Sequence, residues 1–308
     1  MDKETEFFWE SRLKGMQIDM FGKRRYKVNL HMHTTLSDGR CTPGEAVQVY
    51  QRSGYDAIAL TDHWFYGEGE ESPAFTVLSG AEYNLGGADS REGVWHIVCV
   101  GTQRPPSVAK TMSPQGIVDA IHRAGGLAIL AHPAWSLNSP EEIRTLRGLD
   151  GVELYNSVSG VHMSRRADSS LIVDLLGKEG FLLPLHAADD THYYDNDVCL
   201  SWIMVEADDN APEFLLPAIR AGRFYATQGP EVHLLREGDE MVVRCSPCSE
   251  IILRSNLVWS RAIFTGEGLC EARYRLRGNE SFIRAEVVDA NGKHAWSQAI
   301  ALGGAEKG

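Results

Sequence analysis

Two histidines, His31 and His33, stand one residue apart in the stretch "NLHMHTTLSDG", and Asp38 follows five residues after the second. Side chains at positions i and i+2 of a β-strand share one face, so both imidazoles can bind one metal ion if this stretch is a strand. The chain has 11 histidines among its 308 residues, so such a pair also arises easily by chance. The pair indicates metal chemistry only if more ligands lie elsewhere in the chain.

Further imidazole and carboxylate side chains follow short apolar runs. These runs end in "LTDH", "FTVLSGAEYN", "LAILAHP" and "LHAADDTH", and one more histidine lies in "VWHIVCV". Parallel barrels place their active sites at the C-terminal ends of their strands, where such side chains meet. Imidazole and carboxylate ligands without thiolate favour Zn, Mn or Fe, and nine ligands fit two or three ions better than one. The candidate ligands are His31, His33, Asp38, His63, Glu82, His96, His132, Asp190 and His192.

The elements that must position these side chains alternate between apolar strands and helices through the first two thirds of the chain. Capping-box patterns at residues 42–45 and 139–142, and Ser113-Pro114, indicate three helix starts. Strand and helix alternation repeated about seven or eight times favours a barrel over an open sheet. The stretch "RRADSSLIVDLLGKEG" predicts one more helix, whose apolar face carries Leu171, Ile172, Leu175 and Leu176.

The sequence pattern changes after about residue 229. From there, short strands and turns alternate without helix signals, and Asn291-Gly292 is a strong hairpin signal. We therefore expect an α/β protein with a TIM-like barrel in residues 1–228, which includes an N-terminal arm in residues 1–25. A small all-β sandwich domain of the Ig-like kind is expected in residues 229–308.

Composition and charge exclude several classes of protein. The net charge of -12 disfavours a nucleic-acid polymer as partner, whereas a small anionic molecule can still bind at a local positive site. The N-terminal stretch lacks an apolar signal region and no run of 18 apolar residues occurs, so we expect a cytoplasmic protein without membrane association. Cys245-x-x-Cys248 has no second pair to complete a zinc site, which favours reduced cysteines.

The order of the motifs carries a resemblance to a known family. The segments "HMHTTLSDG", "LTDH", the strand end at Glu82, "AHP" and "DDTH" resemble the motif series of the polymerase and histidinol phosphatase (PHP) superfamily of metal-dependent phosphoesterases. The resemblance covers residues 29–192 and implies a distorted seven-stranded β/α barrel with a two- or three-metal centre. The stretch "GRFYATQGP" and the β segment after it resemble the branch that includes carbaryl hydrolase, whose members carry an Ig-like appendage.

The resemblance also implies how the ligands are shared among the ions. It places one metal on His31, His33, Glu82 and Asp190. It has Glu82 bridge to a second metal, which is held by His96 and His132. It leaves a third metal to Asp38, His63 and His192. Many relatives have histidine where this chain has Asp38, and a carboxylate there favours a harder ion such as Mn or Mg.

These observations predict a metal-dependent hydrolase, a phosphoesterase that acts on a small phosphomonoester such as a nucleotide or metabolite. A metal-bound hydroxide would be the nucleophile. Three divalent ions against three carboxylates and one hydroxide leave a positive site that favours a phosphate dianion, whereas two ions leave a neutral site. The catalytic residues expected on this basis are His31, His33, Glu82, Asp190 and His192.

Two alternatives remain open at this point. The same metal site can hydrolyse a carbamate, an amide or a carboxylic ester. A protein of a different class would have lost activity and would bind a partner through the β domain. That alternative needs an exposed aromatic platform, for which Trp259 and Trp296 are the candidates, although both also suit a core.

Several residues near the strand ends are candidates for contact with the substrate. Arg165, Arg166 and Arg223 can hold a phosphate bidentately, or they are solvated surface cations. His162 lies in the same loop as the first two and is a candidate contact. Trp135 either stacks on an aromatic leaving group or covers the pocket rim as ordinary packing.

Other polar residues are candidates for support of the site. Asp62 precedes a candidate ligand and is expected to orient it. Glu153 and Asn156 end another strand on the same rim, where each either contacts substrate or caps the loop, and Asn156 is retained as a substrate-binding candidate. The remaining histidines are expected to be structural or solvated: His122, His186, His233 and His294.

Overall fold

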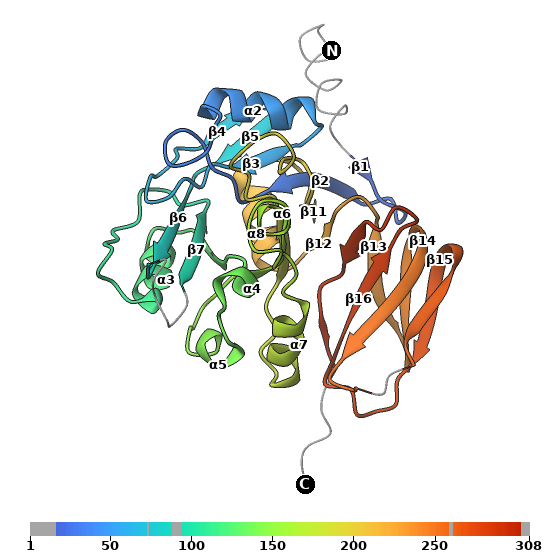
Figure 1. Ribbon diagram of the computed structural model, residues 1–308. Helices are drawn as coiled ribbons and strands as arrows, with labels where there is room; N and C mark the ends of the chain where they lie inside the picture. The colour runs from blue at the N-terminus through green and yellow to red at the C-terminus, as the bar shows by residue number, and fades with distance from the viewer. Residues whose placement is uncertain (1–16, 73, 88–93, 259–260, 303–308) are drawn as a thin grey trace, which may run out of the picture.

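The computed structural model of the protein describes residues 17–72, 74–87, 94–258 and 261–302. An N-terminal part of helices and strands lies beside a C-terminal part made of long strands (Figure 1). The fold class is mixed α/β with large sheets, as the alternation of strands and helices predicted. In the described part of the chain, no helix is long and apolar enough to cross a membrane.

The strands of the N-terminal part lie in two sheets. One sheet has the order β10-β9-β8-β7-β6 and the other contains the order β12-β11-β2-β3-β5-β4, with β1 paired to β2. The strands of the first sheet are β6 (Gly80–Leu85), β7 (Trp95–Val100), β8 (Leu127–Leu130), β9 (Gly151–Asn156) and β10 (Leu185–Ala188). The strands of the second are β1 (Gln17–Ile18), β2 (Arg24–Asn29), β3 (Ala57–Ala59), β4 (Glu70–Ser72), β5 (Phe75–Leu78), β11 (Trp202–Glu206) and β12 (Phe224–Thr227).

The two sheets do not close into a continuous barrel. The expected strand "FTVLSGAEYN" divides into β5 and β6, which belong to different sheets. At this division a Cβ on Gly80 would lie 2.7 Å from the Leu60 carbonyl oxygen, so the close approach requires glycine. Isolated bridges between Met32 and Thr191 and between His63 and Glu82 join the two sheets instead. These bridges keep the strand ends that carry the candidate ligands close together.

Two strands run against the expected direction, and one of them is β11, which is antiparallel to β2. β8, β9 and β10 are parallel to one another, but β7 is antiparallel to both β6 and β8. The prediction of a parallel arrangement is therefore wrong for β7 and β11. Because β7 is reversed, its N-terminal end, which carries His96, lies at the same edge as the C-terminal ends of its neighbours.

The three predicted helix starts, after Thr42, Ser113 and Ser139, are confirmed. The Thr42 amide donates to the Glu45 carboxylate at 2.8 Å and the Ser139 amide donates to the Glu142 carboxylate at 2.7 Å, so both capping boxes form. The helices are α2 (Pro43–Arg52), α3 (Pro114–Arg123), α4 (Pro133–Ser136), α5 (Pro140–Ile143), α6 (Ser157–Val161), α7 (Ser170–Lys178) and α8 (Pro212–Arg220).

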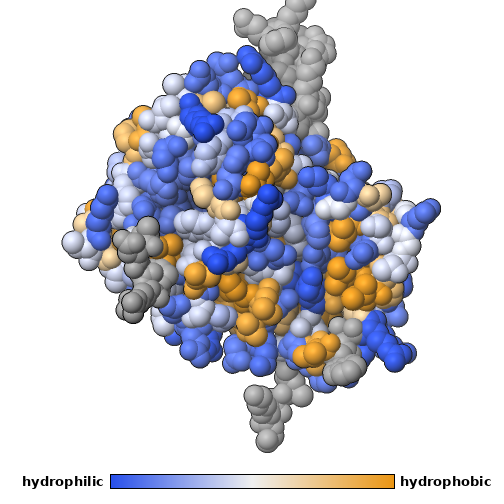
Figure 2. Space-filling view, viewed as in Figure 1, coloured by the Kyte–Doolittle hydropathy of each residue, from blue (hydrophilic) through white to orange (hydrophobic). Residues whose placement is uncertain are grey.

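The apolar face predicted for α7 is confirmed at Leu176 and Ile172, which lie in or against the core, and is wrong at Leu171 and Leu175, which are exposed. Val173 and Leu176 are buried, whereas Leu171 is 72% exposed. Figure 2 shows an apolar patch near α4 and α7 on a largely hydrophilic surface. The Asp174 carboxylate pairs with the Arg284 guanidinium of the C-terminal part at 2.7 and 3.0 Å, and this contact sets the rotation of the helix.

The C-terminal part is all-β and continues the second sheet. β17 pairs with β12, so no separate linker divides the two parts. Trp296 is 1% exposed and stacks on Tyr155 of β9 with ring centroids 5.3 Å apart. The C-terminal strands are β13 (Val232–Glu237), β14 (Glu240–Ser255), β15 (Ile263–Arg275), β16 (Phe282–Val288), β17 (His294–Trp296) and β18 (Ile300–Ala301).

One buried histidine of β10 makes the stability depend on pH. Neither ring nitrogen of His186 has a hydrogen-bond partner in the described residues, and burial lowers the pKa of this imidazole to about 3. The unfolded chain binds a proton at His186 below about pH 6.5, and the folded chain does not until about pH 3. Stability is therefore lost as the pH falls through this window, by about 2 kcal/mol between pH 7 and pH 5.

We expect His186→Leu to reduce this loss. Urea unfolding of the wild type and the variant at pH 7 and pH 5, with a chelator present, measures the difference in free energy of unfolding. His122→Gln is the control, because His122 is a partly exposed histidine that pairs with Asp150. Equal losses in the wild type and His186→Leu would contradict the prediction.

Candidate metal centre

Backbone hydrogen bonds bring the candidate ligands of four strands together. The Asp190 amide donates to the His31 carbonyl at 2.9 Å, which joins the ends of β10 and β2. The Glu82 amide donates to the Asp62 carbonyl at 3.1 Å, which joins β6 to the end of β3. Side chains that are far apart in the sequence therefore lie close together at one end of the two sheets.

The first ligand group consists of four buried side chains, His31, His33, Glu82 and Asp190. His31 Nε2 lies 3.3 Å from His33 Nε2, 3.4 Å from Glu82 Oε2 and 3.2 Å from Asp190 Oδ1. His33 Nε2 lies 3.2 Å from the same Glu82 oxygen and 3.0 Å from the same Asp190 oxygen. Tetrahedral ligands at about 2.0 to 2.1 Å from an ion are about 3.3 Å apart, so the atoms of His31, His33 and Glu82 fit one metal ion, and Asp190 Oδ1 has the same spacing from both imidazoles.

The electrostatics of this group also fit a cation. Asp190 Oδ1 is buried and has no hydrogen-bond partner among the described residues. Although burial opposes the shift, the Asp190, Glu153 and Glu82 carboxylates hold the pKa of His31 well above its usual value. A bound divalent ion would satisfy both the orphaned oxygen and this negative field.

The second ligand group uses the other oxygen of Glu82. His96 Nδ1 lies 2.7 Å from Glu82 Oε1, and His132 Nε2 lies 3.5 Å from it. His132 Nε2 is also 3.6 Å from Asp190 Oδ2. Glu82 thus offers one oxygen to each group, which suits a carboxylate that bridges two ions.

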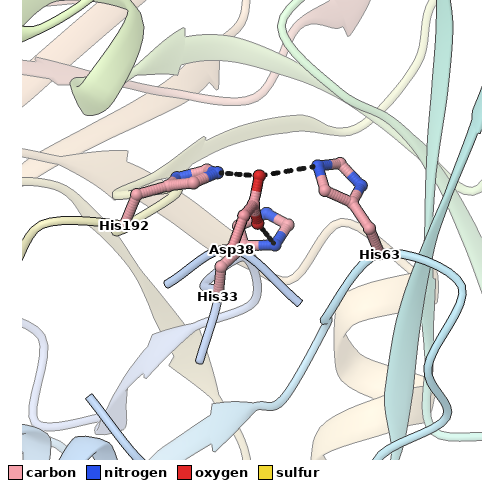
Figure 3. A group of neighbouring side chains, drawn as sticks. All are labelled: His33, Asp38, His63 and His192. Atoms are coloured by element: carbon pink, nitrogen blue, oxygen red, sulfur yellow. Dashed lines mark ion pairs between the residues drawn. The ribbon is translucent and has the colours of Figure 1, made fainter. Parts of the chain in front are cut away.

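The third ligand group surrounds Asp38 and is the most open (Figure 3). Asp38 Oδ2 lies 3.5 Å from His192 Nε2 and 3.8 Å from His63 Nε2. His33 joins this group through Nδ1, which is 3.5 Å from Asp38 Oδ1. His192 Nδ1 donates to the Asp190 carbonyl oxygen at 2.8 Å, so Nε2 of the neutral ring has a lone pair for a metal.

A pocket of about 120 Å³ opens onto the three groups. Its wall combines ligand side chains with apolar ones, including Trp135, Val158 and Met163. None of its lining residues, all within the described ranges, is lysine or arginine. The charge of the pocket therefore depends on the ligand groups and on any ions that they hold.

Similarity to known proteins is weak in sequence and stronger in fold. No family model matches the chain. The uncharacterized protein MJ1587 of Methanocaldococcus jannaschii is 28% identical over 144 residues, which cover 42% of this chain and 82% of that protein.

A solved structure from Bacteroides vulgatus, a two-domain protein containing a predicted PHP-like metal-dependent phosphoesterase, has a TM-score of 0.55 and 15% identity. An amidohydrolase from Chromobacterium violaceum has a TM-score of 0.40 and 18% identity, over 56% of this chain and 89% of that one.

The match to the Bacteroides protein extends over both parts of the molecule. It covers 93% of this chain and 97% of the other. The chain has a PHP-like fold. The resemblance that the motif series indicated is thus confirmed at the level of the fold, including the presence of a C-terminal β part. At 15% identity the likeness concerns architecture and not substrate.

Backbone strain in this PHP-like fold is found at the ligand groups. His132 has a φ of 27° and Asp190 a φ of 54°, and Trp64, which directly follows His63, has a φ of 55°. Such angles cost about 1–3 kcal/mol each in residues other than glycine and persist where the surroundings fix them. Three of the seven non-glycine residues with positive φ in the described part of the chain therefore lie at or directly beside candidate ligands.

β9 of the PHP-like fold carries no candidate ligand but supports three of them. Glu153 Oε1 lies 2.7 Å from His31 Nδ1, and Glu153 Oε2 accepts from the His132 amide at 2.9 Å. Asn156 Nδ2 donates to Glu153 at 2.9 Å and to Asp190 Oδ2 at 3.1 Å. Both residues are buried, so the structure gives Asn156 a positioning role in place of the predicted substrate contact. The orienting role of Glu153 was missed, although its signal was a carboxylate in the apolar strand "GVELYN".

Asp62 supports the site through a loop. Its carboxylate accepts from the Thr34 amide and hydroxyl and from the Ser37 hydroxyl, each at 2.7 Å. Ser37 Oγ in turn lies 3.3 Å from His33 Nδ1. Asp62 therefore shapes the segment between two ligands, whereas the sequence suggested that it orients the ligand beside it.

The predicted substrate-binding residues after α6 lie at the rim. Arg165 and Arg166 are exposed in the segment that also carries Met163 of the pocket wall. The His162 ring lies 4.1 Å from the ring of Tyr193, and its Nε2 is 3.2 Å from an Asp195 oxygen. These side chains can meet a part of the substrate that extends out of the pocket.

One predicted arginine lies away from the ligand groups, and one that was not predicted lies beside them. The Glu206 amide donates to the Arg223 carbonyl, and Glu206 pairs with Arg25 at the start of β2, the end opposite His31. The structure therefore does not bring Arg223 to the ligand groups. Arg40, which sequence reasoning did not single out, donates its amide to the His192 carbonyl at 2.8 Å and so lies beside the third group.

Proposed function

We propose that this protein is a metal-dependent hydrolase with two or three divalent ions, and that it acts on a small phosphomonoester. The proposal is carried by nine imidazole and carboxylate side chains that converge around one pocket, three of which, His31, His33 and Glu82, have the mutual spacing of tetrahedral ligands. The PHP-like fold supports it. These ligands suit Zn, Mn or Fe, and the carboxylate of Asp38 at the open group also suits Mg.

The chemistry divides between the ions and the chain. Divalent ions bound here would act as Lewis acids toward a phosphoryl oxygen and would lower the pKa of water from 15.7 to about 7. The oxygen of water joins phosphorus, the P–O bond to the organic part breaks, and the leaving alkoxide takes a proton. In the metal-free protein, burial opposes the shift, but Asp38 and Asp190 raise the pKa of His192 to about 9. If only two ions bind and His192 is not a ligand, its imidazole would supply that proton.

No side chain of the pocket wall is placed as a nucleophile. Ser159 is the hydroxyl-bearing residue among those that line the pocket. It is buried, and its hydroxyl donates to the Asn156 side-chain oxygen at 2.8 Å. Water is therefore the nucleophile that this pocket favours.

The second candidate function is hydrolysis of a carbamate, amide or ester at the same centre. It is favoured by the lack of lysine and arginine among the lining residues, because phosphate sites commonly include such cations. The candidate in which the β domain alone binds a partner has less support. Trp296 is buried, so it gives no exposed platform, and Trp259 lies outside the described residues.

Metal loading and a substrate panel test the proposal. Protein loaded with Zn²⁺, Mn²⁺, Fe²⁺ or Mg²⁺ is expected to hydrolyse phosphomonoesters and to contain two or three ions per chain by elemental analysis.

His33→Ala should lose at least one ion and most of the activity, because His33 contributes to two ligand groups. His122→Gln should retain the ions and the activity. Faster turnover of esters or carbamates than of any phosphomonoester would favour the second candidate. Full activity in His33→Ala would exclude the centre as the active site.

A further inference from the structure

Part of the wall of the pocket is apolar. Trp135, Val158 and Met163 form this wall together with buried Ser159. The other lining residues are ligand candidates: Asp38, His63, Glu82, His96, His132, Asp190 and His192. One side of the pocket is thus suited to an anionic head group and the other to a group without charge.

The volume limits what the pocket can hold. Sites for drug-sized molecules enclose about 300–1,000 Å³, and an apolar cavity of about 150 Å³ holds one benzene ring. This pocket has about 120 Å³. This is less than the volume that holds one ring alone, so a head group at the ligands fills most of the pocket. The organic part then packs against the apolar residues at the open rim, where Met163 is 39% exposed, and a whole nucleotide does not fit inside.

Trp135 is held next to the second ligand group. It lies in the short helix α4, which starts directly after His132. Its ring is edge-on to His132 at 4.9 Å and 79°, and edge-on to His96 at 5.5 Å and 76°. These contacts hold the indole beside the position where a phosphoryl group would bind.

Met163 provides an adaptable part of the apolar wall. It follows α6 and is 39% exposed. An unbranched thioether side chain at a pocket rim adapts its shape to an apolar ligand. The two residues come from different segments of the chain and meet at one pocket, so their contribution does not depend on a single loop.

We propose that the organic part of the substrate is a compact apolar group no larger than one ring, and that Trp135 and Met163 determine this specificity. The inference rests on the proposed hydrolysis of a phosphomonoester. It separates the two substrate classes that the sequence left open, because it favours a small apolar monoester over a nucleotide. A nucleotide would place its base and sugar outside the pocket, at a rim that carries Arg40, Arg165 and Arg166.

Benzyl phosphate and glycerol 1-phosphate test this inference, since their leaving alcohols have similar acidity. The wild-type enzyme is expected to prefer benzyl phosphate by about 100-fold in kcat/KM, because single methylene differences in apolar pockets already give 10–200-fold. Trp135→Ala and Met163→Ala should each lower this ratio about tenfold, and Trp135→Phe should restore most of it. Leu137→Ala, two residues after Trp135 and exposed, is the control that keeps the ratio.

A binding measurement separates this inference from the proposed function. Calorimetry compares benzylphosphonate with methylphosphonate on the metal-loaded protein, and neither compound is hydrolysed. Tighter binding of benzylphosphonate that Trp135→Ala or Met163→Ala removes would support the apolar pocket, even if no phosphomonoester is turned over. Equal binding of the two phosphonates, or an unchanged substrate ratio in both variants, would overturn it. A higher kcat/KM for a nucleotide than for benzyl phosphate would overturn it as well.

Discussion

Glu82→Gln is expected to reduce hydrolysis about a thousandfold and to remove at least one metal ion per chain. The Glu82 carboxylate is 1% exposed and has imidazole nitrogens on both of its oxygens. Oε2 lies 2.9 Å from His63 Nδ1, in addition to its place in the first ligand group, and Oε1 belongs to the second. Glutamine keeps the size but removes the negative charge and one metal-binding oxygen. Loss of metal catalysis costs several kcal/mol in the transition state, which corresponds to about three orders of magnitude.

Elemental analysis and steady-state kinetics of the same preparation measure both effects. Glu71→Gln is the matched control, because Glu71 is an exposed carboxylate of β4 away from the ligand groups. The wild type and the control should contain the same number of ions. Glu82→Gln protein with a full set of ions and near-normal kcat would show that this carboxylate does not bridge the centre.

The sequence predicted the candidate ligands because a metal ligand is recognisable by the chemistry of its side chain. His31, His33 and Asp190 stand at strand ends in the order of the PHP motifs, and backbone hydrogen bonds then bring those ends together. The direction of β7 was not predictable in the same way. Buried parallel and antiparallel strands both appear as apolar runs, so "VWHIVCV" gives no sign that the strand is reversed.

Supporting residues were harder to predict than ligands. Glu153 and Asn156 have ordinary interpretations as capping or surface residues, and only the pairing of β9 with β8 and β10 places them against three ligands. Likewise, Arg223 was selected because its loop was expected beside the ligands, but β11 runs antiparallel to β2 and therefore ends, next to Arg223, at the opposite end of the sheet from His31. A prediction of contact depends on strand direction, which the apolar pattern does not encode.

The boundary between the two parts has a similar explanation. The change of sequence pattern near residue 229 marks the end of the helical segments. It does not show that the second sheet continues into the C-terminal part through the pairing of β12 with β17. Gln298 of the C-terminal part accepts from the Leu185 amide at 2.7 Å and donates to the Leu185 carbonyl at 3.1 Å. The C-terminal part thus holds β10, the strand that leads to Asp190, and contributes to the shape of the site without a ligand of its own.

Glu153→Gln is expected to weaken metal binding about 10–100-fold, with little change in kcat once the metal is saturating. Glu153 is buried and does not line the pocket, so it acts through its neighbours, above all His31, whose Nδ1 lies 2.7 Å away. A carboxylate at one ring nitrogen fixes the orientation of the imidazole and makes the other nitrogen a better ligand. Glutamine keeps the shape of the side chain but offers His31 a neutral oxygen. Its NH2 group would take the place of Oε2, which accepts hydrogen bonds from the His132 amide and from Asn156 Nδ2.

The dependence on metal concentration distinguishes this positioning role from that of a ligand. Activity of Glu153→Gln titrated with metal against a competing chelator should reach a wild-type plateau at a higher metal concentration, whereas Glu82→Gln should remain inactive at any concentration. Glu141→Gln, an exposed carboxylate in the first turn of α5, should titrate as the wild type does. A lower plateau with unchanged metal affinity would place Glu153 in the reaction itself. A merely structural role would instead lower thermal stability without this shift, so the metal titration is the measurement that decides.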